Sequence, residues 1–254
     1  MRKLSSLPPS LQSLKKPPTE LFYKGDLSLL ECKKIAIVGT RKPNPYARFF
    51  TQSLASLIRK HGGVVVSGGA LGVDIIAHTA AFPHTIMLAP TDLDHFYPAT
   101  NKTMIQKIYT EALALSEYKD NPSPRAYHFL ERNRIVIALS DVVVIPQADL
   151  ESGSMESAKI ALNLAKPLYV LPHRIGESEG TNALLQEGKA QAIYNPKKWI
   201  EENLGTLDLA QDEILEFCSL SPSFEEAYAR FGDKLYEYEL EGKIERKNGK
   251  IYVP

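Results

Sequence analysis

A glycine-rich turn joins an apolar segment of this chain to a segment with helical periodicity. It reads Ser67-Gly68-Gly69-Ala70-Leu71-Gly72. Because glycine has no Cβ atom, an anion can approach the backbone amides of such a turn, and the N-terminus of the following helix adds about half a positive charge. The alternative is a turn that only packs the helix against the strand. The residue types at this junction favour the phosphate-binding interpretation.

Two other turns carry basic or polar residues at equivalent places. Arg41 and Lys42 follow Gly39-Thr40, directly after the first long apolar segment, and Gly153 and Ser154 follow the apolar segment that ends at Pro146. Two anion-binding turns at neighbouring strand ends suit a phosphodiester chain, or one nucleotide with a long phosphate arm. The G-x-G-x-x-G fingerprint is missing after the first of these segments, which argues against a dinucleotide cofactor.

Arginines and aromatic residues are interleaved between positions 125 and 134. Arg125, Arg132 and Arg134 surround Phe129. Single-stranded nucleic acid is bound by this combination, in which guanidinium groups contact phosphates and ring faces stack on bases. Arg132 and Arg134 point in different directions on a helix, so we expect one to face the ligand and the other to pair with a carboxylate.

The residues that could form a catalytic or metal site do not have the required spacing. The six histidines make no metal-ligand pattern with the two cysteines, Cys32 and Cys218. Asp74 and His78 are four residues apart, a spacing more typical of a hydrogen bond on a helix than of a metal site. A Walker loop and a serine nucleophile elbow are also missing. We therefore expect no catalytic residue, no metal and no cofactor.

The candidate residues must be positioned by alternating strands and helices. Continuous apolar runs typical of buried parallel strands span residues 34–39, 64–67, 85–88, 112–116, 141–146 and 168–171. Helical patterns span residues 46–61, 73–81, 129–139 and 157–164. This alternation predicts an α/β fold with an extended Rossmann-like, doubly wound, mostly parallel sheet. In such sheets ligands bind beyond the carboxyl ends of the strands, where the three turns lie.

Composition divides the chain into four parts. We expect a lead-in over residues 1–31, a Rossmann-like domain over 32–204, a linker over 205–211 and a small C-terminal domain over 212–254. Three short helical patterns and the turn Asn248-Gly249 predict a winged-helix-like C-terminal domain. The whole chain has a net charge of zero, but residues 212–254 hold ten acidic and six basic residues. A polyanion should therefore bind the large domain.

The sequence indicates a location in a reducing compartment. It has no apolar run near the roughly 20 residues of a membrane helix and no signal-peptide pattern at its start. The two cysteines lie far apart and are interpreted as free thiols. We expect a cytoplasmic protein that does not bind a membrane.

Seven motifs in order resemble the DNA-processing protein A (DprA/Smf) family of bacterial competence factors. The resemblance covers about residues 17–195. The motifs are Ile35-Ala36-Ile37-Val38-Gly39-Thr40-Arg41; Ser67-Gly68-Gly69-Ala70-Leu71-Gly72-Val73-Asp74 with Ala77-His78; Leu93-Asp94 with Tyr97-Pro98 and Asn101; Leu115-Ser116-Glu117; Phe129 with Arg132-Asn133-Arg134-Ile135; Ser152-Gly153-Ser154; and Gly180-Thr181-Asn182 with Leu184-Leu185.

The resemblance implies a homodimer that binds and protects incoming single-stranded DNA during natural transformation and helps load the RecA recombinase. It implies no catalysis. It makes residues 32–204 the DNA-binding domain, with Arg41, the Ser67-Gly68-Gly69 turn, Phe129 and the nearby basic residues lining the DNA pocket. The helix over 181–188, with Leu184 and Leu185, is a candidate dimer contact, although both leucines could equally belong to the core.

Two other functions remain open. Gly153-Ser154-Met155-Glu156 resembles part of the P-G-G-x-G-T-x-x-E motif of LOG-like nucleoside-monophosphate phosphoribohydrolases. Here Pro146-Gln147-Ala148 replaces the leading Pro-Gly-Gly, and the segment between the two parts is longer. A passive scaffold with an unused pocket is the third possibility, and it predicts no salt-sensitive binding to oligonucleotides.

Overall fold

The structure is a computed structural model that describes residues 1–121, 123–206 and 213–253. The chain divides into two compact units, Met1–Gly205 and Thr206–Pro254. Each unit is described separately below.

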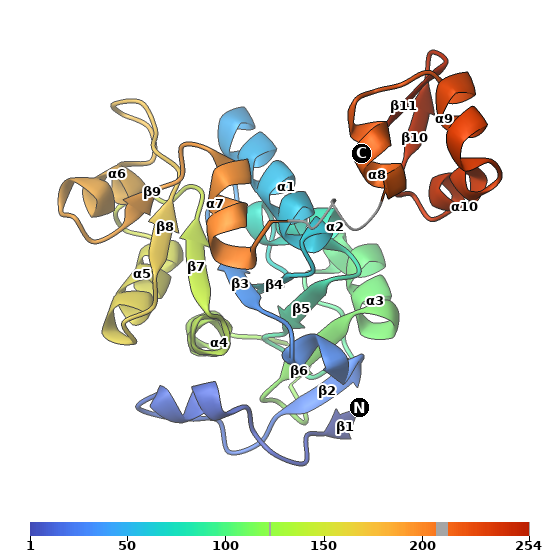
Figure 1. The fold of residues 1–254 in the computed structure, drawn as a ribbon. Helices are drawn as coiled ribbons and strands as arrows, with labels where there is room; N and C mark the ends of the chain where they lie inside the picture. Colours follow the sequence, from blue (N-terminus) through green and yellow to red (C-terminus); the bar gives the residue numbers. More distant parts are fainter. Residues whose placement is uncertain (122, 207–212, 254) are drawn as a thin grey trace. The chain divides into compact units, whose positions relative to one another are not determined.

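The first unit is built on a nine-stranded sheet in the order β1-β2-β6-β5-β4-β3-β7-β8-β9 (Figure 1). Strands β3 to β9 pair in parallel, whereas β1 and β2 join the β6 edge antiparallel. The expected doubly wound, mostly parallel sheet is confirmed. Its strands are β1 (Arg2–Lys3), β2 (Phe22–Gly25), β3 (Lys34–Ile37), β4 (Val64–Ser67), β5 (Thr85–Leu88), β6 (Leu113–Ser116), β7 (Val142–Ile145), β8 (Leu168–Val170) and β9 (Gln191–Ala192).

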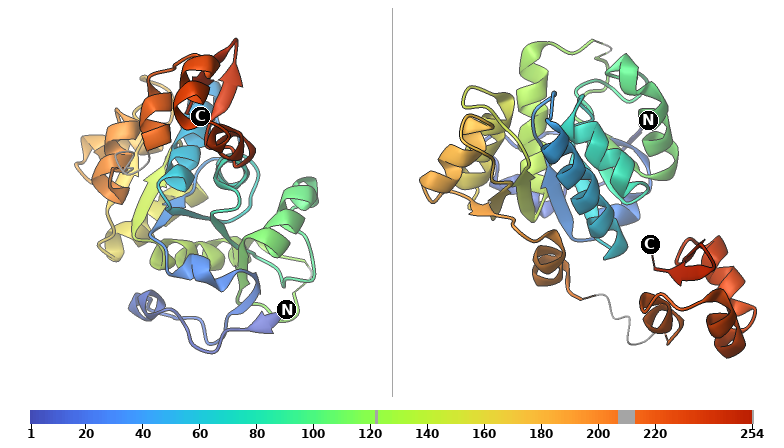
Figure 2. Two further views of the ribbon diagram at one scale, coloured as in Figure 1. Left: turned by 45° about the vertical axis from the view of Figure 1, so that its right-hand side comes forward. Right: turned by 90° about the horizontal axis from the view of Figure 1, so that it is seen from above.

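Helices cover both faces of this sheet (Figures 1 and 2). One face packs against α1 (Pro45–Lys60), α2 (Val73–Ala81) and α7 (Pro196–Leu204), with Trp199 and Ile200 in the shared core. The other face packs against α4 (Ala126–Leu139), α5 (Gly153–Asn163) and α6 (Glu179–Gln186), while α3 (Lys102–Glu111) lies beside α2 on the first face, with Tyr109 against Lys24 of β2. The strand order reverses between β3 and β7, so the carboxyl ends of these two strands form the topological switch point.

The first 31 residues belong to this unit. Strand β2 pairs antiparallel with β6, and the 3-10 helices Pro9–Ser13 and Leu27–Leu30 flank it. Leu11 and Leu21 are buried in the core. We expected no element here from the sequence, because a four-residue edge strand and two short 3-10 helices are too short to produce a periodic pattern.

Two helices begin earlier than the sequence pattern predicts. Helix α5 begins at Gly153 rather than at residue 157, because Ser152 caps it by accepting a hydrogen bond from the amide of Met155. Helix α4 begins at Ala126 rather than at residue 129. Both shifts bring helix N-termini close to the switch point.

The second unit contains α8 (Glu213–Ser219), α9 (Phe224–Phe231), α10 (Lys234–Leu240) and a hairpin of β10 (Glu245–Lys247) and β11 (Lys250–Tyr252). Its small core consists of Ile214, Cys218, Ala227, Leu235, Ile244 and Ile251. The three helices and the hairpin correspond to the three short helical patterns and the Asn248-Gly249 turn of the sequence, while the winged-helix assignment stays a prediction. Most of the expected linker, residues 207–211, lies outside the described residues. Among the residues that the structure describes, no helix is long and apolar enough to cross a membrane.

Candidate nucleic-acid interface

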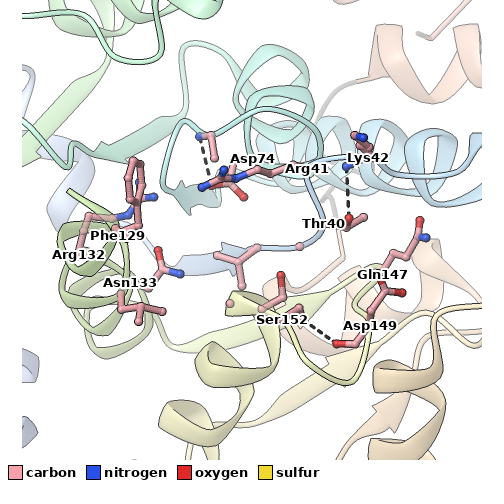
Figure 3. Close-up of a pocket in the computed structure, with 17 residues that line it drawn as sticks. Thr40, Arg41, Lys42, Asp74, Phe129, Arg132, Asn133, Gln147, Asp149 and Ser152 are labelled. Atoms are coloured by element: carbon pink, nitrogen blue, oxygen red, sulfur yellow. Dashed lines mark hydrogen bonds between the residues drawn. The ribbon is translucent and has the colours of Figure 1, made fainter. Parts of the chain in front are cut away.

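A cleft with a volume of about 730 Å³ opens at the carboxyl ends of β3 and β7 (Figure 3). Four segments contribute its walls: the turn after β3, the turn into α2, the first half of α4, and the loop from β7 into α5. Figure 3 shows side chains from all four segments around the opening. The cleft therefore occupies the switch point, where an open α/β sheet is expected to bind a ligand.

Arg41 and Lys42 supply positive charge on the wall formed by the turn after β3. Both side chains are exposed and line the cleft. The turn is held by the Lys42 amide, which donates to Thr40 Oγ1 at 3.2 Å, and by the Asn44 amide, which donates to Gln147 Oε1 at 2.8 Å. These bonds fix the backbone, so the two long side chains start from a defined position.

Phe129 on α4 provides an aromatic surface opposite this turn. The Arg41 guanidinium carbon lies 5.4 Å from the centre of the Phe129 ring, within the range of a cation–π contact. The Tyr97 ring lies 5.7 Å from the same ring at an angle of 51°. A guanidinium and a half-buried ring thus lie side by side in the cleft, and the guanidinium is that of Arg41 rather than of an arginine interleaved with Phe129 in the sequence.

The N-terminus of α5 opens into the cleft. The Ser152 hydroxyl donates to Asp149 O at 2.7 Å and accepts from the Met155 amide, which fixes the entry into the helix. Gly153 and Ser154 line the cleft, and a Cβ atom at Gly153 would meet nothing within 4 Å. The amides of this first turn are therefore accessible to an anion, in line with the predicted second anion-binding turn.

The glycine-rich turn after β4 lies deeper than expected. Ser67 is buried and donates to Ile37 O at 2.6 Å, and Gly68 and Gly69 are also buried. A Cβ atom at Gly68 would overlap the guanidinium group of Arg132. Ala70 lines the cleft, whereas Ser67, Gly68 and Gly69 are not among the lining residues. The space that glycine leaves at this turn is filled by an arginine of the same chain.

Arg132 joins α4 to the glycine-rich turn from inside the molecule. Its side chain is 3% exposed and donates to Gly68 O and to Leu88 O, the latter at 2.7 Å. Burial lowers the pKa of Arg132 to about 10, and the nearby Asp74 carboxylate opposes this shift. Burial raises the pKa of Asp74, while the positive charge of Arg132 and the Ala70 amide oppose that shift. Arg132 lines the cleft from beneath with Asp74 as its buried counter-charge.

Arg134 and Arg125 lie away from the cleft lining. The Arg134 guanidinium forms an ion pair with Glu117 Oε1 at 2.5 Å. Arg125 is exposed at the N-cap of α4, where its backbone amide donates to His128 Nδ1 at 2.8 Å. Of the two arginines, Arg134 therefore pairs with the mostly buried carboxylate of Glu117, and Arg132 reaches the cleft.

Several polar residues on the cleft wall were not predicted as site residues, among them Gln147 and Asn133. Gln147 follows β7 and accepts the Asn44 amide hydrogen bond, and Asn133 donates to Ser157 Oγ at 3.1 Å. The sequence contained a signal for each residue. Gln147 stands where the phosphoribohydrolase motif has glycine, and Asn133 belongs to the family motif that contains Phe129 and Arg132. Neither residue type has a binding role that can be deduced without the fold.

Glu156, the residue that suggested a nucleotide-cleaving enzyme, lies outside the cleft lining. Its carboxylate pairs with Lys159 at 2.6 Å and is half exposed. It lines a small neighbouring pocket of about 110 Å³ together with Gly153. Within the described ranges, no group of three or more His, Cys, Asp or Glu residues could hold a metal ion.

Solved structures with this fold include a structure of DNA processing protein A from Helicobacter pylori, described for its unique single-stranded DNA binding mode. It is 51% identical, has a TM-score of 0.78, and the match covers 83% of this chain and 95% of that one. The DprA structure from Streptococcus pneumoniae is 34% identical, with a TM-score of 0.73 and coverage of 78% and 71%. The similarity includes sequence as well as fold.

Curated relatives give the same assignment. The DNA processing protein DprA of Bacillus subtilis (strain 168) is 34% identical over 198 residues, which is 76% of this chain and 66% of that protein. The DprA of Streptococcus pneumoniae is 36% identical over 188 residues, again 66% of that protein, so the match spans just under two thirds of either relative. The family model of DNA recombination-mediator protein A matches residues 2–203. The chain belongs to the DNA recombination-mediator protein A family.

Proposed function

We propose that this protein binds single-stranded DNA in the cleft between the β3 turn, α4 and α5. The observation that carries the proposal is the exposed Arg41 guanidinium beside the Phe129 ring, 5.4 Å from its centre. A phosphate of the strand contacts Arg41 and Lys42, and an unstacked base stacks on Phe129. The amides at Gly153 and Ser154 bind a neighbouring phosphate. The single-stranded DNA binding described for the Helicobacter pylori protein, at 51% identity, supports this proposal.

The charges in the cleft favour a polyanion. The lining residues include three with positive charge, Arg41, Lys42 and Arg132, and two with carboxylates, Asp74 and Asp149. Asp74 is buried beside Arg132 and compensates that charge. Lys42 and Arg41 remain exposed, and we assign them the contacts with the DNA backbone, which is negatively charged at every nucleotide.

The proposal extends to the biological role of the family. In the cytoplasm, during natural transformation, the protein protects incoming strands as a homodimer and helps load RecA. The family's description as a recombination mediator supports a role beside a recombinase. Leu184 on α6 is 4% exposed and belongs to the core, so the dimer contact requires other residues, such as the half-buried Leu185. Light scattering should give the mass of two chains, and RecA filaments should assemble faster on protein-coated strands.

The direct test is a salt titration of oligo-dT binding. For wild type, the logarithm of affinity should fall linearly with the logarithm of salt concentration, with a slope of about −0.7 for each phosphate contacted. Arg41→Ala should weaken binding by about 1–3 kcal/mol, roughly 5- to 150-fold, because a charge-assisted hydrogen bond is lost. The matched control is Arg2→Ala, which removes an exposed arginine from β1 at the far edge of the sheet.

Three results would argue against the proposal. Equal affinity and slope for wild type and Arg41→Ala would remove Arg41 from the site. Salt-insensitive or undetectable binding by wild type would favour the passive scaffold. Release of free adenine from AMP would favour the phosphoribohydrolase, for which Glu156 is the candidate residue.

A further inference from the structure

A second cavity, of about 530 Å³, lies beside the cleft between the first turn of α1 and the loop that follows β8. Asn44 lines this cavity, and Gln147 lines the cleft. The Asn44 amide donates to Gln147 Oε1 at 2.8 Å, so this hydrogen-bonded pair separates the two spaces. A DNA strand that leaves the cleft past Lys42 therefore has only a short path along the protein surface to the second cavity.

Two hydrogen-bond acceptors lie next to each other at this cavity, and one of them is unpartnered within the described ranges. The side chain of His173 is fully buried, and its Nε2 lies 2.8 Å from Pro146 O. Because a carbonyl oxygen can only accept, Nε2 carries the hydrogen, and Nδ1 of the neutral ring is an acceptor. Nδ1 has no hydrogen-bond partner among the described residues. Glu177 Oε2 lies 3.9 Å from Nδ1; it is also an acceptor, and the Asn44 side-chain amide donates to it at 3.5 Å.

An aromatic ring lies against these acceptors. Tyr46 is 51% exposed, lines the same cavity, and contacts His173 edge to face at a centre-to-centre distance of 5.6 Å. Arg174 contributes an exposed positive charge at the rim. A ring face, two acceptors and a cation form a combination that matches a nucleotide, whose parts are a flat base, donor groups on the base edge and a phosphate.

We propose that this cavity takes the base of a second nucleotide of the same DNA strand and prefers bases with an exocyclic amino group. The inference rests on the proposed function of the neighbouring cleft. The base stacks on Tyr46 and donates its amino hydrogens to the half-exposed carboxylate of Glu177, which lies beside the buried His173 Nδ1, as glutamate accepts from the amino group of cytosine. Thymine has no amino group. Its single N3–H donor is flanked by two carbonyl oxygens, which face the Glu177 carboxylate unfavourably.

The test compares oligo-dC with oligo-dT of equal length at one salt concentration. Wild type should bind oligo-dC more tightly, by about tenfold, the lower range of discrimination by a well-placed hydrogen-bonded pair. Glu177→Gln offers an amide donor to the carbonyl oxygens of thymine, so it should abolish this preference. Tyr46→Ala should weaken the binding of both oligonucleotides by a similar factor. The matched control, Tyr194→Ala, removes a tyrosine that is 82% exposed and lines neither space, and should change nothing.

The outcomes separate this inference from the proposed function. Equal wild-type affinity for the two oligonucleotides, or a preference that survives in Glu177→Gln, would overturn the inference alone, provided that Arg41→Ala still weakens binding. Cytidine monophosphate that displaces oligo-dC completely would assign the cavity to a free nucleotide and would also overturn it. Absence of any oligonucleotide binding by wild type would overturn the proposed function itself.

Discussion

Acid should destabilise this protein through His78, which is buried as a neutral imidazole. The side chain is 0% exposed on α2, and its Nδ1 lies 2.6 Å from Thr85 Oγ1. The Thr85 hydroxyl donates to Val65 O at 3.0 Å, so it accepts a hydrogen bond from His78 Nδ1–H. A second proton would have to bind Nε2. Burial, and then the positive charge of Arg132, oppose it and lower the pKa of His78 to about 3.

The size of the effect follows from proton linkage. In the unfolded chain His78 titrates near the ordinary histidine pKa of 6.5, so between pH 6.5 and about 3 the unfolded state binds a proton that the folded state does not. The stability due to neutral His78 is fully present above pH 6.5. Below that value the free energy of unfolding falls by about 1.4 kcal/mol for each pH unit, until the pH reaches the pKa of His78 in the folded protein.

Comparison with a non-titrating variant isolates this contribution. His78→Asn retains a donor for Thr85 and cannot be protonated in this range. The pKa of Asp74 is raised by burial, so its contribution has the opposite sign and decreases as pH rises, but Asp74 is present in both proteins.

Denaturant unfolding should be measured at about pH 7.5 and about pH 5.5, where wild type should lose about 1.4 kcal/mol more than the variant. Parallel pH dependence of the two proteins would show that His78 is not held neutral, and would refute the reasoning.

Three further substitutions test the groups around the cleft. Gly68→Ala places a methyl group on the Arg132 guanidinium and should lower the free energy of unfolding by about 1.5–3 kcal/mol, measured by thermal unfolding, because charged hydrogen bonds are broken. Arg134→Gln should lower stability by about 1–3 kcal/mol through loss of the pair with Glu117, and should leave the salt slope of oligo-dT binding unchanged; a smaller slope would assign Arg134 to the DNA. Phe129→Leu should weaken oligo-dT binding by about 1–3 kcal/mol, the usual contribution of one stacked base, and unchanged affinity would exclude stacking on this ring.

The sheet could be predicted from sequence because its strands are buried on both faces. Segments such as 64–67 and 142–145 are entirely buried and read as continuous apolar runs. Strand β2 gave no such signal, since only Phe22 of its four residues is buried. The early start of α5 was missed for a related reason: Ser152-Gly153-Ser154 has turn composition, and its role as a helix cap depends on the conformation of the preceding loop.

Cleft residues could be predicted from sequence where the strand topology alone determines their position. Arg41 and Lys42 follow β3, and Gly153 and Ser154 follow β7, so two strands that pair in parallel bring the four together at one edge of the sheet. The glycine-rich turn shows what sequence could not decide. Glycines indicate that another group approaches the backbone closely, but they do not indicate whether that group is a ligand or, as at Gly68, a side chain of the same protein.

The exposed Arg41, and not the buried Arg132, gives the cleft its uncompensated charge. Asp74 compensates Arg132, and the charge of Arg41 lowers the pKa of Arg132, so the two guanidinium groups are close enough to repel each other. Arg41 forms no salt bridge with a carboxylate in the part of the chain that the structure describes. A bound phosphate would relieve this repulsion by supplying the missing counter-charge. Neutralising Asp74 should therefore strengthen the attraction of the cleft for DNA while it weakens the fold, because the same carboxylate stabilises Arg132 and reduces the positive potential at the cleft.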